Sequence, residues 1–206
     1  RKMIVIIDFG MGNLSSINYK LRQAGFESMI SSDAEIISSA SKLILPGVGN
    51  FKTAMENINS LKLKEILDKQ VLVHKKPILG ICLGFQLFCE HSAEGDKKGL
   101  GWIRGKVRKF SFEKEENRKV PHVGWNTLHL EKQDPIFANV PSKQRFYFTH
   151  SYYVECDSLV SISTTNYGIS FTSALRRNNI VGTQFHPEKS HKSGFQVVRN
   201  FCEINE

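Results

Sequence analysis

The sequence predicts an α/β fold with a mainly parallel central sheet, helices on both faces and antiparallel additions. In the first half of the chain, short apolar runs rich in β-branched residues alternate with amphipathic stretches, which is the order of parallel strand–helix–strand units. From about Trp102 the texture changes to short, alternating, aromatic-rich segments typical of antiparallel strands. Neither a Pro/Ser-rich linker nor a repeat divides the 206 residues, so we expect one domain over residues 1–206.

Four buried strands and several helices are expected in chain order. The strands are residues 4–7, 26–30, 43–45 and 77–81, and all but the second are apolar runs next to turn residues. The helices are expected at residues 15–24, at 51–73 as one or two helices with a break near Asn59, at 83–90 and at 191–203.

Two of these helices have clear boundaries or inward faces. Gly25 ends the first helix, and in the last helix Phe195, Val198 and Phe201 or Cys202 recur at the spacing of an inward face. The charged run at residues 113–119 is expected to be a solvated turn between two strands.

Composition and charge exclude several classes of protein. Lys and Arg number 28 against 20 Asp and Glu, which gives a net charge of +8. The basic residues are spread over the chain without an aromatic-interleaved cluster, so we do not expect nucleic-acid binding. No apolar run approaches the roughly 20 residues of a membrane span. The four cysteines are scattered and form no CxxC pair, so neither a disulfide framework nor a metal site is expected, and the compartment is expected to be the cytoplasm.

A nucleophile is indicated where the strand at residues 77–81 meets the next helix. Gly80, Cys82 and Gly84 form a GxCxG turn, and glycines on both sides of a reactive residue allow a tight strand-to-helix elbow. The helix N-terminus favours the thiolate of Cys82. By contrast, Gly10 and Gly12 lack the third glycine of a dinucleotide motif, where Ser15 stands, so no cofactor is expected.

A general base and its orienting acid are indicated near the other end of the chain. Among seven histidines, His122, His150 and His186 stand in the least polar surroundings. His186 follows the apolar run at residues 180–185 and is therefore expected at a strand end. Glu188 lies two residues beyond, a spacing at which its carboxylate can hold one imidazole nitrogen while the other faces a nucleophile.

Residues 80–86 form the motif GxCxGxQ, and residues 186–188 form the motif HPE. With both motifs in this order, the sequence resembles the class I, triad-type glutamine amidotransferases over essentially its whole length. The resemblance implies a flavodoxin-like amidotransferase domain. It also implies that Cys82 attacks the side-chain amide of glutamine, that His186 protonates the departing ammonia and that Glu188 orients His186. Water then releases glutamate from the thioester.

The same resemblance implies further residues around the L-glutamine substrate. Gln86, one turn past the nucleophile, would hold the amino-acid end of glutamine, together with backbone groups of Ser151 and Tyr152. Gly49 and Leu83 are the expected oxyanion donors.

Several loops further resemble the glutaminase subunit of imidazole glycerol phosphate synthase. The matching segments are residues 8–14, 46–51, 94–95, 99–101, 121–126 and 148–153. Phe9, Phe85 and Val123 depart from the usual residues, by volume-tolerant apolar exchanges. The resemblance implies a heterodimer with a (β/α)8-barrel cyclase, which uses the ammonia to make imidazole glycerol phosphate and an aminoimidazole carboxamide ribonucleotide in histidine biosynthesis.

The family further implies that the nucleotide ligand of the barrel re-aims the oxyanion strand, here residues 46–49. The residues expected on the partner-facing rim are Asn13, His122, Trp125 and Asn126. Part of the +8 charge is then expected to meet an acidic face of the barrel.

Three alternatives stay open at this stage. A paralogous glutaminase that supplies a surface-sugar amidotransferase would keep the chemistry and change the pathway. A basic nucleic-acid-binding module is the alternative from another class. A catalytically dead regulatory subunit is the third, although the intact Cys-His-Glu set argues against it.

Overall fold

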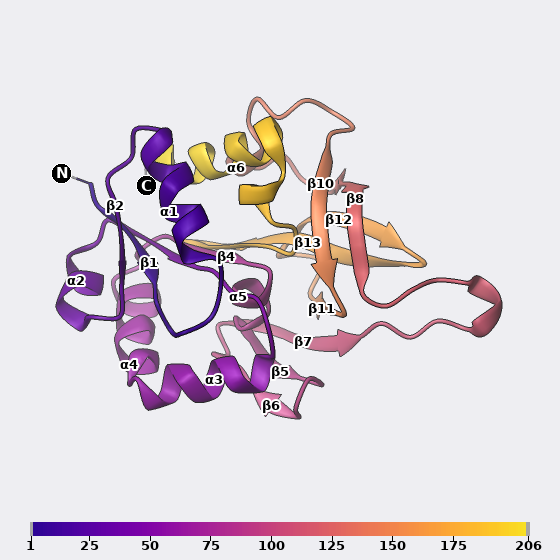
Figure 1. Cartoon of the computed structure of the whole chain (residues 1–206), viewed down its shortest axis with the longest axis horizontal. Helices are drawn as coiled ribbons and strands as arrows, with labels where there is room; N and C mark the ends of the chain where they lie inside the picture. The colour runs from indigo at the N-terminus through magenta and orange to yellow at the C-terminus, as the bar shows by residue number, and fades with distance from the viewer. Residues whose placement is uncertain (1, 205–206) are drawn as a thin grey trace.

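The computed structural model describes residues 2–204 and contains a central sheet with helices on both faces (Figure 1). Residues 1, 205 and 206 of the expected domain lie outside the described residues. The parallel part of the sheet consists, in spatial order, of β2 (Ser28–Ser31), β1 (Ile4–Ile7), β3 (Lys42–Leu45), β4 (Ile78–Ile81) and β14 (Ile180–Thr183). This arrangement confirms the predicted α/β fold class.

The second half of the chain extends this sheet with mostly antiparallel strands. Next to β14 follow β13 (Ile169–Arg177), β11 (Tyr152–Cys156), β7 (Ile103–Lys109), β5 (Cys89–Ser92) and β6 (Lys97–Lys98), while β12 (Ser161–Tyr167) pairs with β13 and with β9 (His129–Leu130). Among the described strand pairs of this second half, only β5 and β7 run parallel. A separate antiparallel ribbon of β8 (His122–Thr127) and β10 (Arg145–His150) packs against the sheet (Figure 1).

The helices form two layers. On one face lie α1 (Leu14–Gln23) and α6 (His191–Glu203). The other face carries α2 (Ala34–Ser39), α3 (Phe51–Ser60), α4 (Leu63–Asp68) with its π-helical extension Lys69–Val73, and α5 (Leu83–Gln86). Short 3-10 turns occupy Lys114–Glu116, Pro135–Phe137 and Pro187–Lys189. No helix within residues 2–204 is long and apolar enough to cross a membrane.

Side-chain alternation along the parallel strands divides the core into these two layers. In β1, Val5 and Ile7 point toward α2, α3 and α4, whereas Ile4 and Ile6 point toward α1 and α6. Both faces of β1, β3, β4 and β14 are buried, so these strands are mainly apolar in the sequence, whereas β2 is partly exposed.

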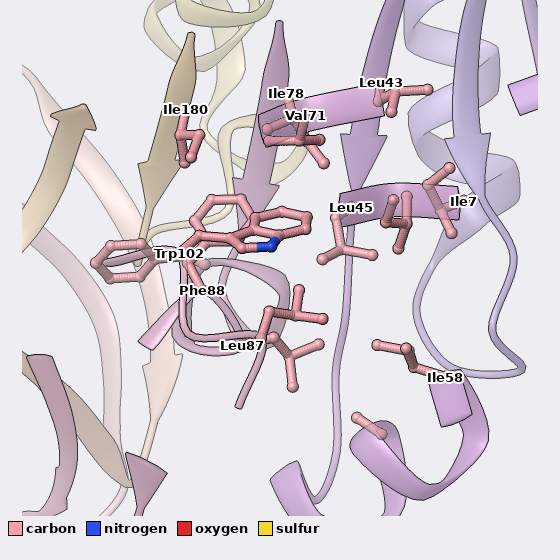
Figure 2. Close-up of a cluster of buried hydrophobic side chains, with 14 of the residues drawn as sticks. Ile7, Leu43, Leu45, Ile58, Val71, Ile78, Leu87, Phe88, Trp102 and Ile180 are labelled. Atoms are coloured by element: carbon pink, nitrogen blue, oxygen red, sulfur yellow. The ribbon is translucent and has the colours of Figure 1, made fainter. Parts of the chain in front are cut away.

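Trp102 is buried in the core layer that packs against α2, α3 and α4. Its ring lies 5.4 Å from the ring of Phe88, between centroids, and Figure 2 shows both beside Ile180 and Leu87. The indole Nε1–H donates to Oδ1 of Asp68 at 2.7 Å, so the one polar atom of this buried side chain is satisfied.

The helix expected at residues 83–90 is much shorter than predicted. It ends at Gln86, because the following backbone pairs with a distant segment: the amide of Leu100 donates to the Leu87 carbonyl at 2.8 Å, and that of Ile103 to the Phe88 carbonyl at 2.9 Å. A Cβ on Gly99 would lie 2.1 Å from the Cys89 carbonyl oxygen. This close approach of two backbones turns residues 89–92 into strand β5.

Other boundaries agree with the expectations. The long helical stretch breaks after Ser60, where Lys62 has a left-handed φ of 56°. The closing helix spans the predicted residues, and Val198 and Phe201 are buried as expected, whereas Phe195 is only half-buried. Helix α2 was not expected; the Asp33 side chain caps it by accepting from two amides of its first turn.

Candidate active site

Cys82 occupies a strained elbow between β4 and α5. Its φ of 53° with ψ of −107° lies outside the common backbone regions, and the side chain is 6% exposed. A Cβ on Gly84 would lie 1.8 Å from the Leu45 carbonyl oxygen, and one on Gly80 would lie 2.5 Å from the Phe88 ring. The two glycines therefore permit the turn, as their spacing around Cys82 predicts.

His186 and Glu188 meet at the end of the neighbouring strand. β14 runs parallel to β4, so the carboxyl ends of both strands lie at one edge of the sheet. The 3-10 turn that begins at Pro187 brings the Glu188 carboxylate back to the imidazole, with Nδ1 and Oε1 2.8 Å apart. Both side chains are almost completely buried.

The environment of His186 favours the imidazolium. Burial alone would lower its pKa, but the neighbouring charge of Cys82 and the hydrogen bond to Glu188 outweigh burial and raise the pKa from 6.5 to about 10. The second ring nitrogen, Nε2, has no hydrogen-bond partner; together with Oε2 of Glu188 it is one of two such buried side-chain atoms within residues 2–204. A buried, unpaired proton carrier next to a thiol is the arrangement that acid–base catalysis requires.

A cavity of about 280 Å³ opens beside the Cys82 sulfur. All five residues expected around the substrate line this cavity, together with others that the sequence motifs had not assigned. Its walls are Val48, Gly49, Cys82, Leu83, Gln86, Glu94, Pro121, Thr149, His150, Ser151 and Tyr152. The elbow, the loop after β3 and the loop between β10 and β11 thus converge on one space large enough for an amino acid.

Gln86 and the Tyr152 backbone are linked across this cavity. The Gln86 side-chain amide donates to the Tyr152 carbonyl at 3.0 Å and to Oε1 of Gln184 at 3.1 Å. Gln184 in turn donates toward the Cys82 sulfur at 3.6 Å. Three distant segments are therefore fixed relative to the sulfur by polar contacts.

The backbone at the expected oxyanion position is already engaged. The Leu83 amide donates to the Gly47 carbonyl at 3.2 Å, so this donor is occupied within the protein. Gly49 has a φ of +118°, and a Cβ there would lie 2.6 Å from the Met11 terminal methyl group. The loop after β3 thus holds a conformation that only glycine tolerates at this position.

The four residues expected on the rim differ in their exposure. Asn13 is exposed and Trp125 is 39% exposed, with its ring stacked on that of His191 at 4.9 Å. Asn126 is half-buried. His122 is only 3% exposed, which corrects the expectation of a surface position: in β8 the alternate residues Val123 and Trp125 face outward, and His122 faces the interior.

The sequence motifs missed two groups next to the nucleophile. The Thr149 carbonyl lies 3.8 Å from the Cys82 sulfur, and the Gln184 side-chain amide lies 3.6 Å from the same atom. Gln184 stands two residues before His186, at the same strand end, so its position was the available signal. Thr149 contributes only its backbone carbonyl, and the type of its side chain does not reveal that this carbonyl lies near the sulfur.

Comparison with known proteins identifies the family of this chain. The model of the family described as glutamine amidotransferase class-I matches residues 5–204. The chain is 48% identical over 202 residues to imidazole glycerol phosphate synthase subunit HisH 2 of Methanococcus maripaludis, covering 98% of this chain and 99% of the relative. It is 45% identical over 203 residues to subunit HisH 1 of Campylobacter jejuni, covering 98% of this chain and 100% of that relative.

Solved structures with lower identity share the fold. A crystal structure of a glutamine amidotransferase superposes with a TM-score of 0.75 at 17% identity and 97% coverage of both chains. PurLQS from Thermotoga maritima gives a TM-score of 0.70 at 18% identity, covering 98% of this chain and 97% of that one. The chain belongs to the class-I glutamine amidotransferase family, in the group of the HisH subunits of imidazole glycerol phosphate synthase.

Proposed function

We propose that this protein, as one domain over residues 1–206, hydrolyses glutamine to glutamate and ammonia through Cys82, His186 and Glu188. The ammonia passes to a (β/α)8-barrel cyclase subunit, which makes imidazole glycerol phosphate and the aminoimidazole carboxamide ribonucleotide of histidine biosynthesis. The observation that carries the proposal is the His186 ring: it is bound to Glu188 on one nitrogen, unpaired on the other and electrostatically coupled to Cys82.

The chemistry follows from the protonation states. The Cys82 thiolate attacks the carboxamide carbon of glutamine, and its electron pair displaces the C=O π electrons onto oxygen. His186 Nε2–H then protonates the amide nitrogen, the C–N bond breaks and ammonia leaves a glutamyl thioester. Neutral Nε2 next takes a proton from water, the hydroxide attacks the thioester, and collapse of that intermediate expels the thiolate and glutamate. Glu188 stabilises the positive charge of His186 before the attack of Cys82 and again after water has given up its proton.

The engaged Leu83 amide supports control of this reaction by a partner. An oxyanion needs free N–H donors in the transition state, and the Gly47 carbonyl holds one of them. Rotation of the peptide planes at residues 46–49 would release Leu83 and turn amide donors toward the substrate. The glycines of this segment make such a rotation accessible, and ligand binding to the barrel is the proposed trigger.

A closed path to the partner has a chemical reason. Ammonia released into neutral water is mostly ammonium, which has no free electron pair for attack, so the two active sites must communicate without solvent. The exposed apolar side chains of Val123 and Trp125 on β8, together with Asn13, form the proposed docking rim. The heterodimer would act in the cytoplasm, in agreement with four unpaired cysteines.

Basic residues adjoin this rim. A hollow of about 1180 Å³ is lined by Trp125 and by several cationic side chains, among them Lys20, Lys143, Arg145 and Lys192. We place the docking contribution of the +8 charge here, against an acidic face of the barrel.

The test is glutamate release by the chain alone, with the barrel partner, and with the partner plus its nucleotide ligand. We expect weak activity alone and strong stimulation in the full complex, both abolished by Cys82→Ala. Stimulated activity that survives Cys82→Ala would refute the mechanism. Stimulation by the barrel of a surface-sugar amidotransferase, and not by the histidine-pathway barrel, would replace the pathway while keeping the chemistry.

A further inference from the structure

Two buried histidines outside the triad form a pair next to the glutamine cavity. His122 on β8 and His150 on β10 stand opposite each other in the ribbon, with Nδ1 of His122 2.9 Å from Nε2 of His150. His150 lines the cavity that contains Cys82, and its Nδ1 lies 2.7 Å from the Tyr152 carbonyl oxygen. On the far side, Nε2 of His122 lies 3.3 Å from the Asn126 amide nitrogen.

The partners of the pair determine where its protons are. A carbonyl oxygen only accepts, so His150 carries its proton on Nδ1 and donates it to Tyr152. The other nitrogen of a neutral His150 must then accept, which places a proton on Nδ1 of His122. His122 Nε2 is left as an acceptor for the Asn126 amide. Every contact is satisfied in this single direction, from Asn126 through both rings to Tyr152.

Both rings are neutral near pH 7. Burial lowers the pKa of His150 to about 3, although the hydrogen bond to the Tyr152 carbonyl acts to raise it. Burial also lowers the pKa of His122 to about 4. The directed chain therefore persists over the physiological pH range.

The hydrogen-bond chain ends at the Tyr152 carbonyl, in the wall of the cavity that contains Cys82. The Tyr152 carbonyl receives two donors, Nδ1–H of His150 and the Gln86 side-chain amide. One residue before His150, the Thr149 carbonyl lies 3.8 Å from the Cys82 sulfur. Holding His150 in one tautomer thus fixes the backbone at residues 149–152 and the side chain of Gln86 together.

We propose that His122 and His150 are positioning residues for glutamine, and that their hydrogen-bond chain couples β8 to the substrate wall. The outer face of the same strand carries Val123 and Trp125, so a displacement of β8 on docking would reach Tyr152 through two hydrogen bonds. This inference rests on the proposed glutaminase function, and it assigns the pair to glutamine binding rather than to proton transfer at Cys82.

Two substitutions of His122 separate hydrogen bonding from packing. His122→Asn keeps an N–H donor near the position of Nδ1 but removes the aromatic ring. His122→Phe keeps a ring that can stack on Tyr167, now 4.1 Å away between centroids, and on Phe148, but removes the donor. The hydrogen-bond chain predicts that Phe is the more harmful replacement, and a packing role predicts the reverse.

The first measurement is steady-state glutamine hydrolysis by the complete complex with the barrel partner. We expect His122→Phe to raise KM for glutamine about tenfold, with a smaller change in kcat, because it leaves a buried acceptor on His150 unpaired. We expect His122→Asn to stay within about threefold of wild type. A wild-type KM in His122→Phe, or a larger defect in His122→Asn, would overturn the proposal.

The second measurement does not depend on activity. Nitrogen NMR of the histidine rings in the wild-type chain should show neutral His150 protonated on Nδ1 and neutral His122 protonated on Nδ1, unchanged between about pH 6 and pH 8. The opposite tautomer, or a charged ring in this range, would refute the chain even if His122→Phe fails to fold. A wild-type complex without glutaminase activity would instead refute the proposed function.

Discussion

Replacing His186 by Asn should make Cys82 far less reactive toward alkylation at neutral pH. The attraction that raises the pKa of His186 to about 10 is mutual, so loss of the imidazolium removes the same stabilisation from the thiolate. The variant then has no cation beside the sulfur to favour the thiolate over the thiol at neutral pH. Because a more strongly stabilised thiolate is also a weaker nucleophile, we expect the rate to fall about tenfold rather than by the full ratio of ionised fractions.

The assay is the rate of iodoacetamide labelling of the Cys82 peptide, followed by mass spectrometry from about pH 6 to pH 10. The exposed His129→Asn variant serves as the matched control. His186 stays protonated below its raised pKa and loses its proton as the pH rises through about 10, so wild-type reactivity should change little between about pH 7 and pH 9.

The His186→Asn variant lacks this cation, so its labelling rate should lie below that of the wild type at pH 7 and approach it near pH 10, where the wild-type ring loses its proton. Equal rates for wild type and variant at pH 7 would refute the ion pair. A gap of constant size up to pH 10 would show that access to the sulfur, and not its ionisation, had changed.

Three other predictions follow from the fold and its charges. Gly84→Ala places a Cβ 1.8 Å from the Leu45 carbonyl oxygen and should destabilise the protein by about 3 kcal/mol, seen as a lower Tm, whereas an unchanged Tm would contradict the steric account. Trp102→Phe leaves Asp68 without its indole donor and should lower the free energy of unfolding in denaturant by about 1–2 kcal/mol. The loss should exceed that of Asp68→Asn, which keeps an acceptor for the indole, and a smaller loss than in Asp68→Asn would contradict the account. Association with the barrel should slow as salt rises, and Lys192→Glu, in the basic hollow, should lower the on-rate more than it raises the off-rate; rates independent of salt would remove the electrostatic role of the hollow.

The elbow and its base could be predicted because their chemistry is local. A reactive residue between two glycines needs the turn that the structure shows at Cys82, and Glu188 lies only two residues from the ring it holds. The parallel strands were predictable for a similar reason, since burial on both faces produces continuous apolar runs.

Features that depend on distant backbone could not be predicted in this way. The helix after Cys82 stops at Gln86 because Gly99, which follows β6, allows a second backbone to approach. The buried position of His122 depends on the rings of Phe148 and Tyr167 from other strands. Neither contact leaves a periodic pattern in the sequence.

The most direct test of the central claim is to trap the covalent intermediate on Cys82. The wild-type complex turning over glutamine is quenched in acid and digested, and the peptides are analysed by mass spectrometry, with hydroxylamine added in a parallel reaction to intercept a thioester. We predict a glutamyl group on the Cys82 peptide and glutamyl hydroxamate in the parallel reaction, both absent from Cys82→Ala. Glutamate formation at an undiminished rate, with no glutamyl group on Cys82 and no hydroxamate, would contradict the account.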